Sequence, residues 1–233
     1  MPTTLVVLAI ALVTAAVAYY LLVTTEGTYL GARVVALLYD WSARSYDRIK
    51  NLHVVNEARH IGIPLSERLM TLGVSRLLDV GCGTGRVASA LRLAGDYQGT
   101  IIGLDRSRGM LSQAAERLCP ADDPTHLMIG DAQHVPLADA SVGAVTCLEA
   151  IEFFPSPRDA MAEFWRVLEP GGLLLTSNRV GMDAGWLPFR HVGRGKLEAL
   201  VQATGFVAVD TERWQVHYDL IWALKPHTSA RSE

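Results

Sequence analysis

Cysteine is scarce in this chain, and neither sign of charge dominates it. The 233 residues include 3 cysteines, Cys82, Cys119 and Cys147, whose spacing matches neither a disulfide framework nor a C-x-x-C metal or redox site. Lys and Arg number 21 and Asp and Glu 24, a net charge of -3. We therefore expect a reducing compartment and no nucleic-acid partner, because no broad basic surface exists to neutralise a run of phosphates.

The sequence also lacks internal repeats and low-complexity stretches. Hydrophobic residues make up 50% of it and charged residues 19%, which excludes a disordered chain. Its length fits one sizeable α/β domain with additions and excludes a large multidomain assembly. Much of the hydrophobic excess lies in one segment near the N-terminus.

That segment, residues 5–23, contains no charged side chain. As a helix it would be about 29 Å long, close to the thickness of the hydrocarbon core of a bilayer. Two other interpretations are a cleaved signal peptide, because Ala16-Val17-Ala18 resembles a cleavage site, and a buried helix of a soluble domain. We favour an uncleaved transmembrane anchor. A signal peptide has a positively charged n-region, and here no Lys or Arg precedes the apolar run.

Basic residues follow the apolar run, and none precedes it. Arg33, Arg44, Arg48 and Lys50 lie on its C-terminal side, so the positive-inside rule places the rest of the chain in the cytoplasm. Residues 28–50 have a helical pattern, typical of a second helix that lies on the membrane or caps the domain. The expected organisation is a transmembrane helix, a helical cap or linker, a cofactor-binding domain and a disordered tail, over residues 1–24, 25–70, 71–226 and 227–233.

From residue 76 onward, strand-like and helix-like segments alternate. The expected strands are 76–80, 100–104, 126–129, 142–148, 172–177, 206–209 and 217–224, and the expected helices are 86–93, 107–118 and 158–168. This alternation predicts an α/β fold with a mostly parallel sheet covered on both faces. The last two strands are joined through residues 212–214, too short a link for a crossover helix, so we expect that pair to be antiparallel.

A glycine-rich loop follows the first of these strands. Residues 77–86 read LLDVGCGTGR: an apolar strand, an acid, three alternating glycines and the start of a helix. Such glycines permit a tight turn and let a ligand touch the backbone, and the helix N-terminus offers free N–H groups. Arg86 stands where a dinucleotide fingerprint would have another glycine, which disfavours NAD. Asp105 and Asp131 end the next two strands, and a carboxylate at Asp105 can accept both hydroxyls of a ribose.

Five motifs in order, DVGCGTG, GLD, GDAQHVPL, LEAIEFFPSP and RVLEPGGLLL, resemble the class I S-adenosylmethionine-dependent methyltransferases of the type 11 group. The resemblance covers residues 45–225 and implies a Rossmann-like, doubly wound, seven-stranded sheet whose last strand is antiparallel. Many relatives have Glu-His where this chain has Glu152-Phe153, so any role of that histidine toward the acceptor is absent. The Gly-x-Arg-Asn pattern of the C-methylating quinone enzymes and the Pro-Pro-Tyr motif of amino-directed DNA methyltransferases are also missing.

The resemblance implies a cofactor, S-adenosylmethionine, and a role for each matching residue. Asp105 would hold the ribose hydroxyls, Asp131 would accept from the adenine amino group, and Glu149 would face the methionine end. Asp79 would orient the glycine loop or the methionine ammonium. The full set expected at the cofactor is Asp79, Gly81, Cys82, Gly83, Gly85, Asp105, Arg106, Asp131, Ala132 and Glu149.

The residues around the acceptor are less defined by the sequence. A sulfonium methyl is already electrophilic, so the protein must mainly align a nucleophile and exclude water. Where the acceptor is a hydroxyl or an ammonium, a base must remove its proton, and the candidates are His53, Glu149, Glu152 and His191. His53, Glu57 and His60 have metal-ligand spacing on one helix, but we favour a solvated face and expect no metal.

Aromatic side chains provide candidates for substrate binding. Tyr46 precedes the core, where relatives often place a helix over the methyl group, and packing is an equally good explanation for it. Trp186 and Phe189 lie in residues 181–195, a segment rich in glycine and aromatic residues. That segment fits a lid or acceptor loop, a membrane-contacting loop or a plain connector.

The leading functional hypothesis is a membrane-anchored methyltransferase that acts on a lipophilic acceptor, such as a phospholipid headgroup, a quinone-like phenol or an isoprenoid pigment precursor. Alternatives are a methyltransferase of a soluble metabolite or protein with the helix only for localisation, and a non-catalytic cofactor-binding module. A nicotinamide-dependent reductase is disfavoured by Arg86.

Overall fold

The computed structural model describes residues 2–50, 52–118 and 124–227. Their centre is a seven-stranded sheet in the order β3-β2-β1-β4-β5-β7-β6. The strands are β1 (Arg76–Val80), β2 (Thr100–Asp105), β3 (Thr125–Ile129), β4 (Val142–Cys147), β5 (Leu168–Arg179), β6 (Val207–Arg213) and β7 (Tyr218–Leu224). β1 to β5 pair in parallel, and β7 is antiparallel to both β5 and β6. The expected fold class and the antiparallel last pair are confirmed.

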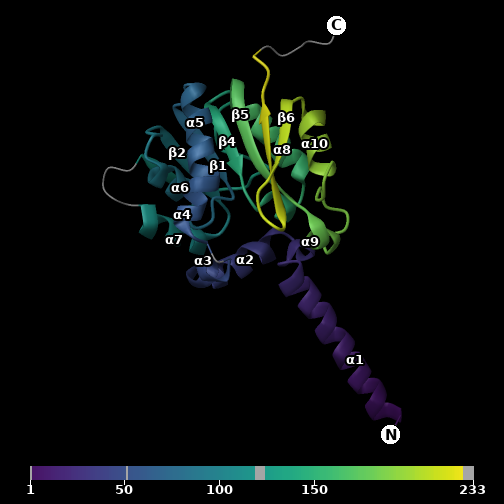
Figure 1. The fold of residues 1–233 in the computed structure, drawn as a ribbon. Coiled ribbons are helices and arrows are strands. Elements are labelled where there is room, and N and C mark those ends of the chain that lie inside the picture. Colours follow the sequence, from purple (N-terminus) through teal and green to yellow (C-terminus); the bar gives the residue numbers. More distant parts are fainter. Residues whose placement is uncertain (1, 51, 119–123, 228–233) are drawn as a thin grey trace.

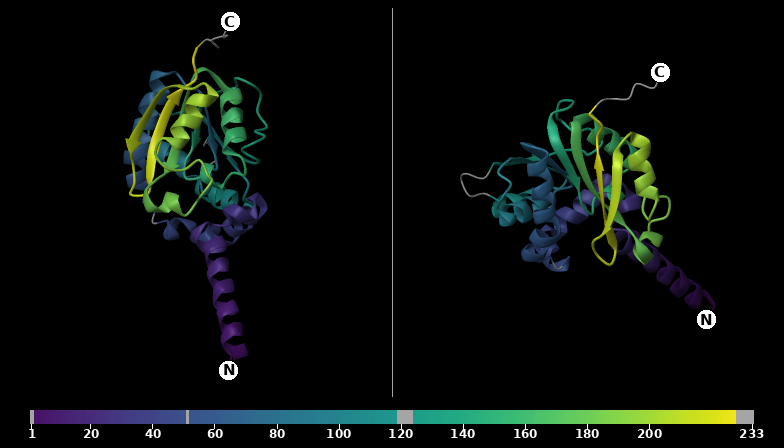
Figure 2. Two further views of the ribbon diagram at one scale, coloured as in Figure 1. Left: turned by 90° about the vertical axis from the view of Figure 1, so that its right-hand side faces the viewer. Right: turned by 45° about the horizontal axis from the view of Figure 1, so that its top comes forward.

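Helices cover both faces of the sheet (Figures 1 and 2). One core joins the strands to α8 (Pro157–Val167) and α10 (Lys196–Thr204), and the other joins them to α5 (Ile63–Thr71), α6 (Arg86–Ala94) and α7 (Arg108–Leu118). Neighbouring residues of β1 divide between the two, since Leu78 belongs to the first core and Leu77 to the second. Because both faces are covered, β4 is buried at every residue, and such strands appear in the sequence as unbroken apolar runs.

Local signals fix the ends of several elements. α8 begins after Ser156, whose Oγ accepts a hydrogen bond from the backbone N–H of Asp159, with Pro157 in the first turn. α10 was not among the expected helices, and it directly follows the expected loop 181–195. The segment 181–195 also contains a short helix, α9 (Gly181–Gly185).

The N-terminal segment is helical and lies apart from the sheet. α1 (Pro2–Tyr19) continues as the π-helix η1 (Tyr20–Thr24) and projects away from the α/β domain (Figure 1). The span Thr3–Thr24 is long and apolar enough to cross a membrane, and none of its most apolar window is buried by the rest of the described chain. The same length and composition also suit a signal sequence.

The expected helix over 28–50 is present but interrupted. It consists of η2 (Thr28–Leu30), α2 (Ala32–Ser42), η3 (Ala43–Ser45) and α3 (Tyr46–Ile49), with α4 (Val54–Glu57) and η4 (Ala58–Gly62) leading into α5. The break before α2 falls at Gly31, whose φ of 92° lies in the left-handed region that glycine adopts without strain. α2 packs against α7, which places it across the ends of the strands rather than in a core. Cys119 and the tail from residue 228 lie outside the described residues.

Candidate active site

The glycine-rich loop joins the end of β1 to α6. Gly81, Gly83 and Gly85 all have positive φ, and the backbone N–H groups of Gly81 and Cys82 donate to the carbonyl of Leu104 at 2.8 and 3.1 Å. A Cβ added at Gly81 would lie 2.5 Å from Ala150 Cβ, whereas one added at Gly83 would meet no atom within 4 Å. Gly81 is therefore required by packing, and Gly83 presents bare backbone to open space.

Asp105 connects the end of β2 to this loop. Its Oδ2 accepts from the backbone N–H of Gly83 and its Oδ1 from that of Ser107, both at 2.8 Å. Desolvation raises the pKa of Asp105, while the backbone hydrogen bonds oppose that rise. Each carboxylate oxygen accepts one backbone bond and retains a second lone pair for a ligand.

Asp131 follows β3 and lies beside Arg106, whose Nη2 is 3.3 Å from Asp131 Oδ2. The Oδ1 of the same carboxylate accepts from the backbone N–H of Gln133 at 3.1 Å. Both Asp131 and Arg106 line a cavity of about 730 Å³, including its open mouth. We call it the main cavity.

The main cavity brings together many of the residues expected from the sequence. Of the expected cofactor set it is lined by Gly81, Gly83, Asp105, Arg106, Asp131 and Ala132. Its other wall, not expected in detail, comes from the inner side of α2 and from η5 (Ile151–Phe153) with its neighbours: Ala32, Val35, Ala36, Tyr39, Ala150, Phe153, Phe154 and Pro155. A smaller adjoining hollow is lined by Asp79, Cys82, Gly83, Arg86 and Tyr46, among others. Tyr46 borders both spaces, which places it between them.

Asp79 is the buried acid beneath the loop. It is 2% exposed, and its Oδ1 accepts a hydrogen bond from Thr146 Oγ1 at 2.7 Å. Burial raises the pKa of Asp79 to about 7. Cys82 and Cys147 are free and buried, and burial also raises the pKa of each thiol, so neither is a reactive nucleophile.

We expect the Asp79→Asn variant to lose part of the pH dependence of stability. Because the folded pKa of Asp79, about 7, lies above the ordinary value of 3.8 for an aspartate, the native state binds one more proton than the unfolded state between these two pH values. Stability from this group is present at pH 4 and is lost as the pH rises through 7. Urea unfolding of wild type and variant at pH 5 and pH 8 checks this, with Asp210→Asn on β6 as the control. If the free energy of unfolding changed equally between pH 5 and pH 8 in the wild type and in Asp79→Asn, the prediction would be wrong.

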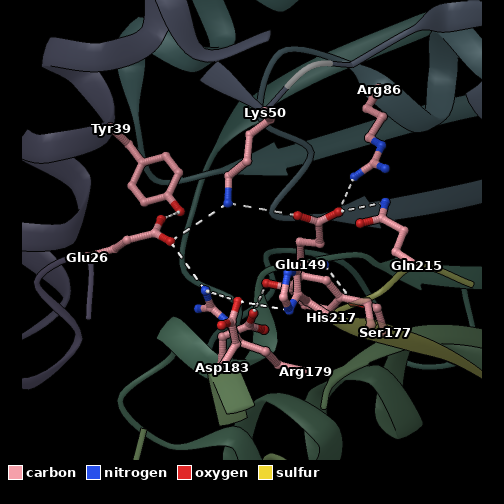
Figure 3. Close-up of polar contacts among 12 residues, drawn as sticks. Glu26, Tyr39, Lys50, Arg86, Glu149, Ser177, Arg179, Asp183, Gln215 and His217 are labelled. Atoms are coloured by element: carbon pink, nitrogen blue, oxygen red, sulfur yellow. Dashed lines mark hydrogen bonds and ion pairs between the residues drawn. The ribbon is translucent and has the colours of Figure 1, made fainter. Parts of the chain in front are cut away.

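A buried charged cluster lies at the end of β4. Glu149 has a φ of 50°, and its backbone N–H donates to Ser177 Oγ at 2.6 Å. Its carboxylate accepts from Arg86 Nη1 at 2.6 Å, and Arg86 Nε donates to Glu57 Oε2, also at 2.6 Å. We call Glu57, Arg86 and Glu149 the arginine cluster. Figure 3 shows Glu149 between Arg86 and Lys50, whose Nζ is 3.9 Å from the carboxylate.

A second polar group faces this cluster from the segment that follows α1 (Figure 3). Glu26, two residues after η1, accepts from Tyr39 Oη at 2.6 Å and lies 3.7 Å from Lys50 Nζ and 3.8 Å from Arg179 Nη2. Arg179 ends β5 and is 9% exposed, and its Nε and Nη1 have no partner among the described residues. The segment after α1 therefore contributes charge directly to the site. Glu26 was not predicted from the sequence. The sequence shows only that it is the first charged residue after the apolar run.

The remaining candidates are more scattered. Glu152 is buried below the site, where it accepts from Tyr218 Oη at 2.7 Å and where burial raises its pKa. His53 is exposed at the start of α4, and His191 follows Arg190 on the loop after α9; neither lines the main cavity or the adjoining hollow. Trp186 and Phe189 are 53% and 100% exposed and do not line these spaces either. Their expected role in substrate binding stays a prediction, because neither side chain lines a wall of these two spaces.

Residues 78–176 match a family described as a methyltransferase domain. The chain is 35% identical over 149 residues to malonyl-[acyl-carrier protein] O-methyltransferase of Yersinia pestis, covering 62% of this chain and 50% of the relative. It is 31% identical over 140 residues to demethylmenaquinone methyltransferase of Lactiplantibacillus plantarum, covering 59% of each. The chain thus spans half to three fifths of the length of these relatives.

A solved structure with the same fold is phosphoethanolamine N-methyltransferase 2 of Haemonchus contortus, in complex with phosphomonomethylethanolamine and S-adenosylhomocysteine. The TM-score is 0.57 and the identity 16%, over 70% of this chain and 52% of that chain. At this identity the likeness concerns the fold. In this chain the main cavity lies at the carboxyl ends of β1, β2 and β3.

Proposed function

Residues 78–176 belong to the methyltransferase domain family, and on that premise we propose that the chain transfers a methyl group from S-adenosylmethionine to a small, lipophilic acceptor at the cytoplasmic face of a membrane. The observation that carries the proposal is the main cavity itself. It combines the bare backbone of Gly83 and the carboxylate of Asp105 with a wall supplied by α2, a helix close to the apolar α1.

The residues of the cavity fit the cofactor chemically. Gly83 offers backbone with no side chain in the way, and Asp105 retains lone pairs for two hydroxyls. Asp79 places a carboxyl group in the wall of the adjoining hollow, which suits the ammonium group of S-adenosylmethionine. When bound, this cofactor supplies an electrophilic methyl group.

The chain's own residues then bind, orient and exclude water. Asp105 and Asp131 orient the two ends of a nucleoside, and α2 covers the cavity with Val35, Ala36 and Tyr39. Glu149 is fixed by two hydrogen bonds, from Arg86 to its carboxylate and from its own N–H to Ser177. In this proposal Glu149 is a positioning residue rather than a free base, because Arg86 and Ser177 already hold its carboxylate and its backbone in place.

The lipophilic class of acceptor is supported by the position of the apolar helix. η1 ends at Thr24, and Glu26 already contacts Tyr39 in the cavity wall, so only Thr25 lies between the helix and this contact. An acceptor dissolved in the bilayer would reach this wall without crossing water. Of the two relatives, the one named a demethylmenaquinone methyltransferase is compatible with a lipophilic acceptor, whereas the name of the other gives a malonyl group on a carrier protein.

Methyl transfer into lipid is the direct test. Detergent-purified full-length protein is incubated with methyl-labelled S-adenosylmethionine and total membrane lipid extract, and label in the organic phase is counted. We expect label there, lost on addition of excess S-adenosylhomocysteine and in the Asp105→Asn variant. Label that appears only with a soluble extract would favour the soluble-acceptor alternative. S-adenosylhomocysteine binding with no label in either extract would favour a non-catalytic module.

A further inference from the structure

The outward side of α2 and α3 carries an alternating basic and apolar stripe. Arg33, Leu37, Trp41, Arg44 and Arg48 are all exposed and recur at intervals of three or four residues, which puts them on one side of the helical segment. Leu37 is 66% and Trp41 88% exposed. The opposite side of the same helix, with Val35 and Tyr39, lines the main cavity. We call these five residues the outer stripe.

A second apolar group lies on the segment from α9 to Phe189, which we call the α9 loop. Met182 is 86%, Trp186 53% and Phe189 100% exposed. Phe189 has a φ of 63°, a left-handed conformation that costs a side chain such as phenylalanine about 1–2 kcal/mol. Exposed apolar side chains of this size do not stabilise a domain in water. A group of them therefore indicates a surface that another molecule covers.

Hydrogen bonds hold the α9 loop against the base of α1. Tyr20 Oη donates to the carbonyl of Trp186 at 2.9 Å, and Tyr29 Oη donates to that of Pro188 at 2.7 Å. Arg190 Nη2 donates to the carbonyl of Thr28 at 2.7 Å. In Figures 1 and 2, α2, α3 and α9 lie at the end of the domain from which α1 leaves. The stripe and the loop thus flank the point where the apolar helix emerges.

Charge identifies the occupant of this surface. Arg33, Arg44 and Arg48 make no ion pair with any residue in the described ranges, although the whole chain has a net charge of -3. Exposed arginines interleaved with Trp and Leu are typical of a helix that lies in the interface of an anionic membrane, because the guanidinium groups meet phosphates while the apolar side chains enter the acyl boundary.

We propose that the outer stripe and the α9 loop together form a docking surface for an anionic lipid bilayer. Leu37, Trp41, Trp186 and Phe189 enter the headgroup–acyl boundary, and the three arginines bind lipid phosphates. The inference rests on the anchoring part of the proposed function, in which α1 spans the same bilayer. It deepens that function, because docking holds the α2 wall of the main cavity at the depth of the lipid headgroups.

Tryptophan quenching tests the docking. The full chain is reconstituted into phosphatidylcholine–phosphatidylglycerol vesicles with brominated or ordinary acyl chains, and its emission is compared between the two. We expect strong quenching by the brominated lipid, most of it lost in the double variant Trp41→Phe, Trp186→Phe. The control is Trp165→Phe, which removes a ring packed on Phe206 at 5.0 Å and is expected to leave the quenching intact.

Flotation of the same vesicles separates the possible outcomes. If the chain floats with the lipid but Trp41 and Trp186 are unquenched, the docking surface is wrong while the anchor stands. If the chain does not float, the anchor and the docking surface both fall. Quenching that is equal with and without phosphatidylglycerol, and unchanged in an Arg33→Gln, Arg44→Gln, Arg48→Gln triple variant, would exclude the binding of anionic lipid by the three arginines. Methyl transfer is measured separately on each sample, so loss of activity is not mistaken for loss of docking.

Discussion

The Gly83→Ala variant should remain folded but bind S-adenosylhomocysteine at least about 100-fold more weakly, a loss of about 2.7 kcal/mol or more. Gly83 lines both the main cavity and the adjoining hollow, and a Cβ built on it meets no protein atom within 4 Å. The added methyl would therefore occupy ligand space rather than clash with the fold. A ligand that approaches the backbone at van der Waals distance has no room for it.

The matched control is Gly73→Ala, in the turn between α5 and β1. Gly73 has a φ of 65° and Gly83 one of 53°, and neither has a neighbour near its Cβ position. Both substitutions should cost about 1 kcal/mol of backbone strain, or about 2–4 °C in Tm. Isothermal titration with S-adenosylhomocysteine and thermal unfolding in the same detergent compare them. Equal affinity in the two variants would show that the ligand does not approach this loop.

The glycine loop was predictable because its signal is local. The apolar residues of β1, the acid and the three glycines are consecutive, and each has a steric or electrostatic reason to be there. The start of β5, in contrast, could not be predicted from local signals. The strand begins at Leu168, earlier than expected, because Leu168 pairs with Val142 and Leu173 with Ala144, so residues 169–172 form an irregularity inside the strand. From the sequence, its Pro-Gly-Gly reads as a turn.

The polar part of the site was not predictable for a different reason. Glu26, Lys50 and Glu57 come from the segment before the sheet, and only tertiary packing brings them to Glu149 and Arg179. A single charged residue in a helical segment has no periodicity that says which partner it meets. The exposed Trp186 and Phe189 illustrate a second limit, since aromatic composition does not tell in which direction a side chain points.

The largest effect on stability should come from Arg86→Met. The side chains of Arg86, Glu57 and Glu149 are 11%, 12% and 7% exposed, and both acids bind the guanidinium at 2.6 Å. Methionine fills a similar volume but leaves two poorly solvated carboxylates on either side of it. Removing one partner of a buried ion pair costs about 3–5 kcal/mol, which corresponds to a fall in Tm of about 6–20 °C for a chain of this size.

Arg76→Met is the same substitution at an exposed ion pair. Arg76 lies 3.9 Å from Glu169, and the two side chains are 52% and 46% exposed, so the expected loss is below about 1 kcal/mol. Urea unfolding of both variants at pH 7.5 measures the difference. If both variants lose the same small amount, the arginine cluster does not hold the N-terminal helices on the sheet, and Glu149 must be positioned by Ser177 and Gln215 instead.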